Sequence, residues 1–163
     1  MDARRRRAPR DLPRALFYRW AGERIDQLAR AQGSAAWGVI LDADETVLDN
    51  SPYELERATL DVPNRADAQC DDTRANFRAL GIAVDAVLCQ QGKESDKNPR
   101  FEAVQRGTAG LPPLRVLMWV GDNIQDFPRL SRSIRGAPDS AFAAFGDHYI
   151  VLPNPMYGSW EKP

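Results

Sequence analysis

Two aspartates, Asp42 and Asp44, follow directly on the apolar stretch 37–41, whose composition is typical of a buried strand. Acidic side chains at the carboxyl end of such a strand face the crevice where open α/β sheets bind ligands. Charge at the tip of a buried strand costs free energy unless it is paired or used. We therefore expect chemistry here, although an Asp-x-Asp pair is also typical of an ordinary turn.

A second pair of carboxylates, Asp122 and Asp126, follows the apolar stretch 114–120 in the same way. If the two strands are neighbours, the four carboxylates converge, and clustered carboxylates repel one another unless a proton or a cation intervenes. Hard oxygen ligands of this kind suit Mg²⁺, which keeps several waters and leaves room for a substrate phosphate. The sequence therefore predicts a magnesium site at the ends of these strands.

A metal at this place allows phosphoryl chemistry by the neighbouring side chains. Asp42 could attack a phosphoryl group and form an aspartyl-phosphate, while Asp44 could protonate the leaving oxygen and later deprotonate water. A cation is then needed opposite the metal to neutralise the phosphoryl oxygens. Lys97 is the first candidate and Lys93 the second, although either lysine could equally be a solvated surface residue.

Length and composition limit the alternatives. The 163 residues suit one domain, and 43% apolar with 28% charged residues is usual for a soluble globular protein. A net charge of -1 gives no general attraction to nucleic acid, and no stretch approaches the roughly 18 apolar residues of a membrane span. His148 is the sole histidine, which argues against a His-based triad. Cys70 and Cys89 could form one disulfide or remain two buried thiols.

The first twelve residues carry a run of four arginines, Arg4 to Arg7. We interpret 1–12 as a disordered basic arm, although such a run could also bind phosphate polymers. It is not followed by the apolar run of a secretion signal. As it stands, the chain is therefore expected in the cytoplasm.

Apolar periodicity and turn residues predict helices that alternate with strands. Such alternation favours a Rossmann-like, three-layer α/β/α domain with a mostly parallel sheet, here assigned to 13–163 as one domain. The expected helices cover residues 13–31, 66–80 and a segment that begins at Asn98, and the expected strands cover 37–42, 85–89, 114–120 and 148–152.

Local signals refine two of these helices. Phe77 and Leu80 are expected on the inner face of the second helix, with Gly81 as its cap. Asn98 is the expected N-cap of the third helix, and Pro99 its first residue.

Three stretches resemble a known family. The run from Asp42 to Tyr53 is similar to the first motif of the haloacid dehalogenase superfamily, and more narrowly of the bacterial class C acid phosphatases, the lipoprotein 5'-nucleotidase group. Residues 121–127 resemble the fourth, metal-binding motif of that group, and 145–161 resemble its C-terminal signature. Members of this group are exported or are outer-membrane lipoproteins, whereas this sequence shows no signal peptide or lipobox.

The resemblance implies a role for each matching aspartate. Asp42 would be the nucleophile and Asp44 the general acid and base. Mg²⁺ would bind Asp42, the backbone carbonyl of Asp44, and Asp122, with Asp126 in support.

The resemblance also implies a third catalytic residue, since Lys97 would be the third-motif lysine. It implies substrate-binding residues as well, of which Asn64 and Arg65 would belong to the second motif. Tyr157 would stack on the base of a nucleotide substrate, although packing of the C-terminal tail remains an alternative.

The segment between the first two motifs departs from the family pattern. From Asp49 to Asn64 there is no room for a helical crossover and a full strand, so residues 58–62 form at best a weak edge strand. Much of the family's cap is missing, with the truncation between about 54 and 62. Pro63 replaces the Ser or Thr of the second motif and has neither a hydroxyl nor an N–H to offer a phosphate.

Two functional hypotheses follow. The first is a Mg²⁺-dependent phosphomonoesterase that acts through an aspartyl-phosphate on a small phosphomonoester, such as a nucleoside monophosphate. The second is a catalytically impaired or inactive member that binds Mg²⁺ or phosphate without efficient turnover.

Overall fold

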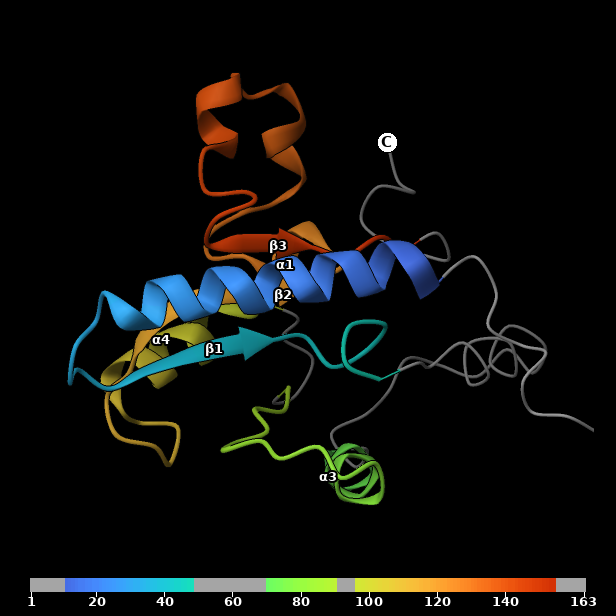
Figure 1. The fold of residues 1–163 in the computed structure, drawn as a ribbon, viewed down its shortest axis with the longest axis vertical. Coiled ribbons are helices and arrows are strands. Elements are labelled where there is room, and N and C mark those ends of the chain that lie inside the picture. The colour runs from blue at the N-terminus through green and yellow to red at the C-terminus, as the bar shows by residue number, and fades with distance from the viewer. Residues whose placement is uncertain (1–10, 49–69, 91–95, 155–163) are drawn as a thin grey trace, which may run out of the picture.

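Three parallel strands form the sheet of this computed structural model, which describes residues 11–48, 70–90 and 96–154 (Figure 1). The strands are β1 (Trp37–Leu41), β2 (Arg115–Gly121) and β3 (Tyr149–Val151), in the order β1-β2-β3. Both pairings are parallel. All three carboxyl ends therefore lie at the same edge of the sheet, as the sequence predicted.

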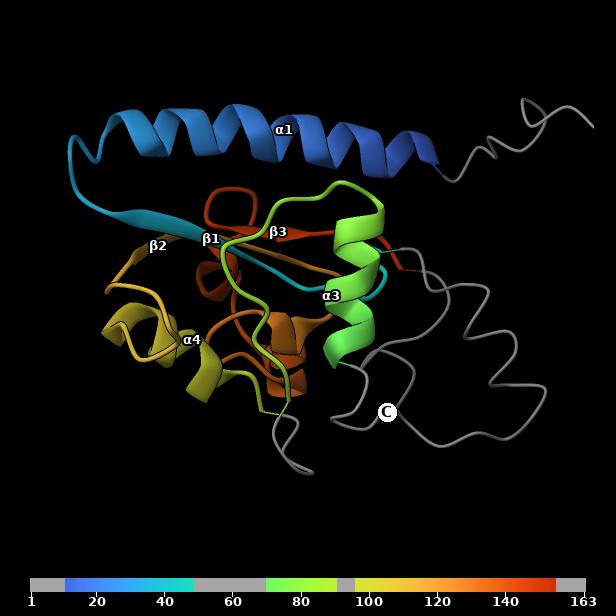
Figure 2. The same ribbon diagram turned by 90° about the horizontal axis from the view of Figure 1, so that it is seen from below.

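One face of the sheet is covered by α1 (Asp11–Arg30), which runs along it in Figure 2. Ala21 of this helix packs against Met118 and Val120 of β2. It also packs against Ile150 of β3 and against Leu152, which follows that strand. Successive side chains of a strand point to opposite faces, so Trp119, which lies between Met118 and Val120, points to the other face of the sheet. A strand buried on both faces explains the nearly continuous apolar run of β2.

The opposite face is covered by α4 (Asn98–Arg106). Phe101 and Val104 of α4 pack against Trp119 and Phe127 in a second apolar cluster. The Phe101 and Trp119 rings meet edge to face, with centroids 6.4 Å apart. The two clusters make the domain a three-layer α/β/α structure, and they confirm the predicted fold class.

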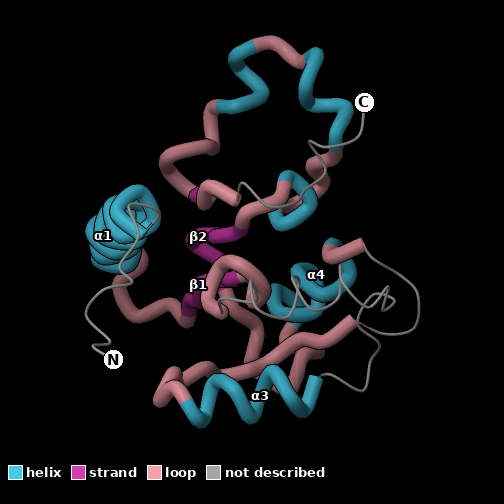
Figure 3. Tube along the Cα trace, turned by 90° about the vertical axis from the view of Figure 1, so that its right-hand side faces the viewer, coloured by secondary structure: helices cyan, strands magenta, loops and turns pink. Residues whose placement is uncertain are grey.

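The remaining helix, α3 (Cys70–Ala79), lies beyond the β1 edge of the sheet (Figures 1 and 3). Its end is capped as expected, because Gly81 takes the left-handed conformation with φ 68° and Ile82 N–H donates to the Phe77 carbonyl at 2.9 Å. Phe77 is buried, but the inner position predicted for Leu80 is wrong. The helix ends at Ala79, and the Leu80 side chain directly after it is 63% exposed.

The strand predicted at 85–89 is also wrong. This segment has no strand partner in the described part of the chain, although its composition suits a strand. Instead, the Val87 and Leu88 carbonyls accept hydrogen bonds from Arg74 and Arg100, each at 3.4 Å. These arginines occupy acceptors that a sheet ladder would have used.

The two cysteines are joined in a disulfide between the first residue of α3 and this segment. Their Cα atoms lie 5.8 Å apart, and 19 residues separate them in sequence. Of the two states considered for Cys70 and Cys89, the structure has the disulfide.

The start of α4 also differs from the prediction. Lys97 rather than Asn98 stands at the N-cap position, and it makes no side-chain capping bond. The carboxylate of Asp96 accepts the Asn98 N–H at 2.9 Å and performs the capping expected of Asn98. Pro99 accordingly lies one position further into the helix than predicted.

Residues 1–10 of the disordered arm predicted over 1–12, and the shortened segment 49–64, lie outside the described residues. The last two residues of the predicted arm belong to α1, which begins at Asp11, so the prediction is wrong for these two positions. Among the helices that are described, none combines the length and apolar character needed to cross a membrane.

We predict that Arg129→Gly stabilises the protein by about 0.5–1 kcal/mol. Arg129 is exposed and has φ 59°, a left-handed conformation that strains a residue with a Cβ atom but not glycine. Denaturant unfolding measures the change. Arg132→Gly is the matched control, since Arg132 lies in the 3-10 helix η4 (Arg132–Gly136) and is not among the described residues with positive φ. This control should lose stability, and equal losses in both variants would contradict the prediction.

Candidate functional site

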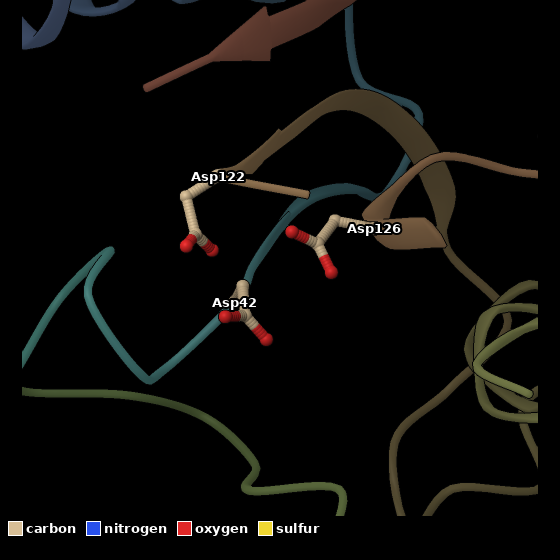
Figure 4. A group of neighbouring side chains, drawn as sticks. All are labelled: Asp42, Asp122 and Asp126. Atoms are coloured by element: carbon tan, nitrogen blue, oxygen red, sulfur yellow. The ribbon is translucent and has the colours of Figure 1, made fainter. Parts of the chain in front are cut away.

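Three aspartates converge at the carboxyl edge of the sheet (Figure 4). Asp42 follows β1, and Asp122 and Asp126 follow β2; an oxygen of each carboxylate lies within 4.8 Å of the others. Asp42 is fixed by the backbone, because its N–H donates to the Val120 carbonyl at 2.9 Å. The expected convergence is therefore present for three of the four predicted aspartates.

The carboxylate of Asp44, the fourth, is not in this group of three. Asp44 lies in the tight turn after β1, where the Val47 and Leu48 N–H groups donate to the Ala43 carbonyl at 3.0 and 2.8 Å. The metal contact expected of Asp44 is through its backbone carbonyl, and that contact stays a prediction.

Asp126 is held by the turn that follows β2, the 3-10 helix η3 (Ile124–Asp126). Asn123 precedes η3 and accepts the Gln125 N–H at 3.3 Å, while its own N–H donates to the Asp126 carboxylate at 2.7 Å. This reciprocal pair is a capping box. Gly121 allows the close approach, because a Cβ atom there would lie 2.3 Å from Asp126 Oδ2.

Lys97 joins two of the three carboxylates. Its Nζ lies 2.5 Å from Asp42 Oδ1 and 2.6 Å from Asp126 Oδ1. Burial disfavours the charged ammonium, but the charges of Asp42 and Asp126 outweigh this and raise the pKa of Lys97 above its ordinary value. Lys97, the first of the two lysines considered, is thus a charged member of the cluster.

The cluster carries more negative than positive charge. Burial, and then repulsion by Asp42, raises the pKa of Asp126 to about 6. Burial likewise raises the pKa of Asp122 to about 6, against the opposing effect of its hydrogen bond from Asn154. When all are ionised, three carboxylates face one ammonium, which leaves two negative charges uncompensated. Hard oxygen donors with this charge excess fit a divalent cation such as Mg²⁺.

Two further residues contact or influence the cluster and were missed from the sequence. Asn154 is buried and donates from Nδ2 to Asp122 Oδ2 at 2.5 Å. It follows β3, so the strand-end rule that found Asp42 could have found it. Arg100 is half-buried on α4, one helical turn after Lys97; burial lowers its pKa, and the charge of Asp42 raises it. Its spacing from Lys97 was the available signal.

The other predicted site residues, Lys93, Asn64, Arg65 and Tyr157, lie outside the described residues, as does Pro63. Their roles stay predictions.

We predict that Asp122→Asn stabilises the metal-free protein at neutral pH. The folded-state pKa of Asp122, about 6, lies above its ordinary value of 3.8, so the folded state binds the proton more tightly than the unfolded state does. Protonated Asp122 therefore stabilises the fold relative to ionised Asp122, and this contribution to the free energy of unfolding is lost as pH rises from about 4 to about 6. The variant should exceed the wild type by up to about 3 kcal/mol near pH 7, with a smaller difference near pH 4. Denaturant unfolding in the presence of a chelator measures both.

The control for this prediction is Asp139→Asn, at an exposed position in the 3-10 helix η5 (Asp139–Phe142). It should leave stability nearly unchanged at both pH values. A wild type as stable as Asp122→Asn near neutral pH would contradict the prediction.

Comparisons with known proteins identify the family and the fold. The family model described as HAD superfamily, subfamily IIIB (acid phosphatase) matches residues 59–160. The class C acid phosphatase from Bacillus anthracis is similar in structure, with a TM-score of 0.71 and 25% sequence identity over 91% of this chain and 80% of that chain. The family match begins after Asp42, whose place in the site comes from the fold. This chain belongs to the subfamily IIIB acid phosphatases of the haloacid dehalogenase (HAD) superfamily.

Proposed function

We propose that this protein is a Mg²⁺-dependent phosphomonoesterase that acts through an aspartyl-phosphate on Asp42. The observation that carries the proposal is the convergence of Asp42, Asp122 and Asp126 at the carboxyl edge of the sheet, where Lys97 contacts the first and the last of them. Membership of an acid phosphatase family supports the reaction class, and members of the HAD superfamily are typically Mg²⁺-dependent.

Asp42, Asp122 and the backbone carbonyl of Asp44 would hold the metal, with Asp126 in support. Bound Mg²⁺ supplies positive charge that balances the carboxylates and the phosphoryl oxygens. Asn154 fixes the orientation of Asp122 through its hydrogen bond, so that one carboxylate oxygen is already engaged before a metal binds.

The first chemical step forms a bond between a carboxylate oxygen of Asp42 and phosphorus and breaks the ester P–O bond. Asp44 donates a proton to the departing oxygen, which leaves as an alcohol. In the second step Asp44 accepts a proton from water, the water oxygen bonds to phosphorus, and the aspartyl-phosphate bond breaks. Inorganic phosphate leaves and the Asp42 carboxylate is restored.

Lys97 places positive charge where the phosphoryl group would be transferred, since its ammonium already contacts Asp42. Fixed positive charge at this point stabilises the negative charge of the transition state without further reorganisation. The substrate would be a small phosphomonoester, such as a nucleoside monophosphate. Asn64, Arg65 and Tyr157 are the proposed contacts to it, on the grounds of motif resemblance.

One observation favours a weaker activity. Pro63 stands where the second motif of the family has a hydroxyl residue, and it offers a phosphate neither hydroxyl nor N–H. Loss of one preorganised donor costs on the order of 10²–10³-fold in rate. The alternative function is therefore binding of Mg²⁺ or phosphate without efficient turnover.

We predict hydrolysis of p-nitrophenyl phosphate by the purified protein when Mg²⁺ is present. Asp42→Asn should lower the rate at least about 10³-fold, because an amide is a poor nucleophile for phosphorus. Initial rates between about pH 5 and pH 7, with and without a chelator, measure both effects. The matched control is Asp139→Asn, an exposed carboxylate of η5, which should keep the wild-type rate.

Two outcomes separate the functions. Absence of Asp42-dependent turnover across this pH range would contradict the phosphomonoesterase. Mg²⁺-dependent thermal stabilisation of the same inactive protein would then favour the impaired member of the family.

A further inference from the structure

We propose that Asn98 is a positioning residue for Lys97, because it fastens the start of α4 to the turn that carries Asp126. The inference rests on the proposed function, in which Lys97 contributes positive charge to phosphoryl transfer. It assigns a role to a side chain that lies next to the carboxylate cluster but outside it.

The Asn98 amide is engaged at both of its ends. Its Oδ1 accepts the Arg129 N–H at 2.7 Å, and its Nδ2 donates to Asp96 Oδ1 at 2.7 Å. The same Asp96 oxygen accepts the Asn98 N–H at 2.9 Å. An acceptor on one side and a donor on the other define the orientation of the amide.

The hydrogen bond to Arg129 joins two elements that both contribute to the site. Lys97 immediately precedes Asn98, and Asp126 lies three residues before Arg129. The same two elements meet again where Lys97 Nζ contacts Asp126 Oδ1 at 2.6 Å. The start of α4 and the turn that carries Asp126 are thus linked twice. One link is the hydrogen bond from the Arg129 N–H to Asn98, and the other is the ion pair of Lys97 with Asp126.

The backbone position of Lys97 determines where its ammonium can lie. The Lys97 carbonyl accepts the N–H groups of Arg100 and Phe101, each at 3.1 Å, so this residue begins the hydrogen bonding of α4. Its side chain is long and flexible, and it carries the charge at its tip. A shift of the helix start therefore moves the ammonium relative to Asp42, and misplacement by about 1 Å can cost about 10²-fold in rate.

The turn that receives Asn98 is itself anchored in the apolar core. Phe127 is completely buried and packs edge to face on Phe145, with ring centroids 5.4 Å apart. Leu130 N–H donates to the Phe127 carbonyl at 3.2 Å and closes the turn, in which Arg129 has φ 59°. Asn98 thus connects the start of α4, through the N–H of Arg129, to a turn that is anchored in the core by Phe127.

A double-mutant cycle of Asn98→Ala with Lys97→Met tests the proposal on the full chain. Asn98→Ala should lower kcat for p-nitrophenyl phosphate about 10-fold with KM changed less than about twofold, since substrate binding groups are untouched. In the Lys97→Met background the same substitution should lower kcat less than about twofold, because Asn98 acts through Lys97. The unfolding free energies of the four proteins are measured as well. The changes caused by the two single substitutions should not add up to the change in the double mutant.

Ser131→Ala is the matched control. Ser131 Oγ also accepts a backbone N–H, that of Ser133 at 3.3 Å, outside the carboxylate cluster. Its loss should leave kcat and KM at wild-type values.

Three results would overturn the positioning role: an Asn98→Ala protein with wild-type kcat, an equal kcat loss in both backgrounds, or a KM effect in place of the kcat effect. Failure of the proposed function is recognised separately, as a wild type without Asp42-dependent turnover. In that case only the unfolding free energies of the four proteins are compared. If the losses of unfolding free energy caused by Asn98→Ala and Lys97→Met add up in the double mutant, the role of Asn98 is overturned.

Discussion

Crowding of three carboxylates at the ends of two neighbouring parallel strands is the constraint on which the rest of the structure depends. Burial and mutual repulsion raise the pKa values of Asp122 and Asp126, and one ammonium, that of Lys97, contacts two of the three side chains. Such a cluster opposes folding unless other parts of the chain compensate. Functional sites commonly hold buried like charges whose pKa values are shifted, although such charges lower the stability of the fold.

The compensation comes from the strand that delivers two of these carboxylates. β2 is buried on both faces, against α1 on one side and against α4 and Phe127 on the other. This packing fixes the strand end, and Gly121 lets the Asp126 carboxylate approach the backbone more closely than any Cβ atom would permit. The apolar layers therefore support the acidic turn, because the packing of β2 on both faces fixes the strand end from which this turn begins.

Local patterns were sufficient for the strands that carry the site, but not for the burial of Leu80 or the N-cap of α4. The apolar runs before Asp42 and Asp122 predicted β1 and β2, and the parallel topology then required their acidic ends to meet. Local patterns failed where a partner distant in sequence decided: residues 85–89 have a strand's composition, but arginines occupy the carbonyls of Val87 and Leu88. The bond from Arg129 to Asn98 joins residues 31 positions apart, and no local pattern reveals it. The strand-end rule could have placed Asn154 near the site, but it does not predict the hydrogen bond from Asn154 to Asp122.

The charge balance also gives a physical reason for metal dependence in the proposed reaction. A phosphomonoester is an anion, and the ionised cluster presents it with three carboxylates and one lysine whose ammonium is already shared between Asp42 and Asp126. Arg100, one helical turn along α4, adds positive charge near Asp42 but forms no ion pair with the cluster among the bonds described. Among the described residues of the cluster, repulsion of the proposed substrate by three carboxylates would therefore exceed its attraction to Lys97 until further positive charge enters the site. In the proposed reaction a divalent cation would supply that charge at the oxygens that repel the substrate. Metal binding and substrate binding would then be coupled through the same three aspartates.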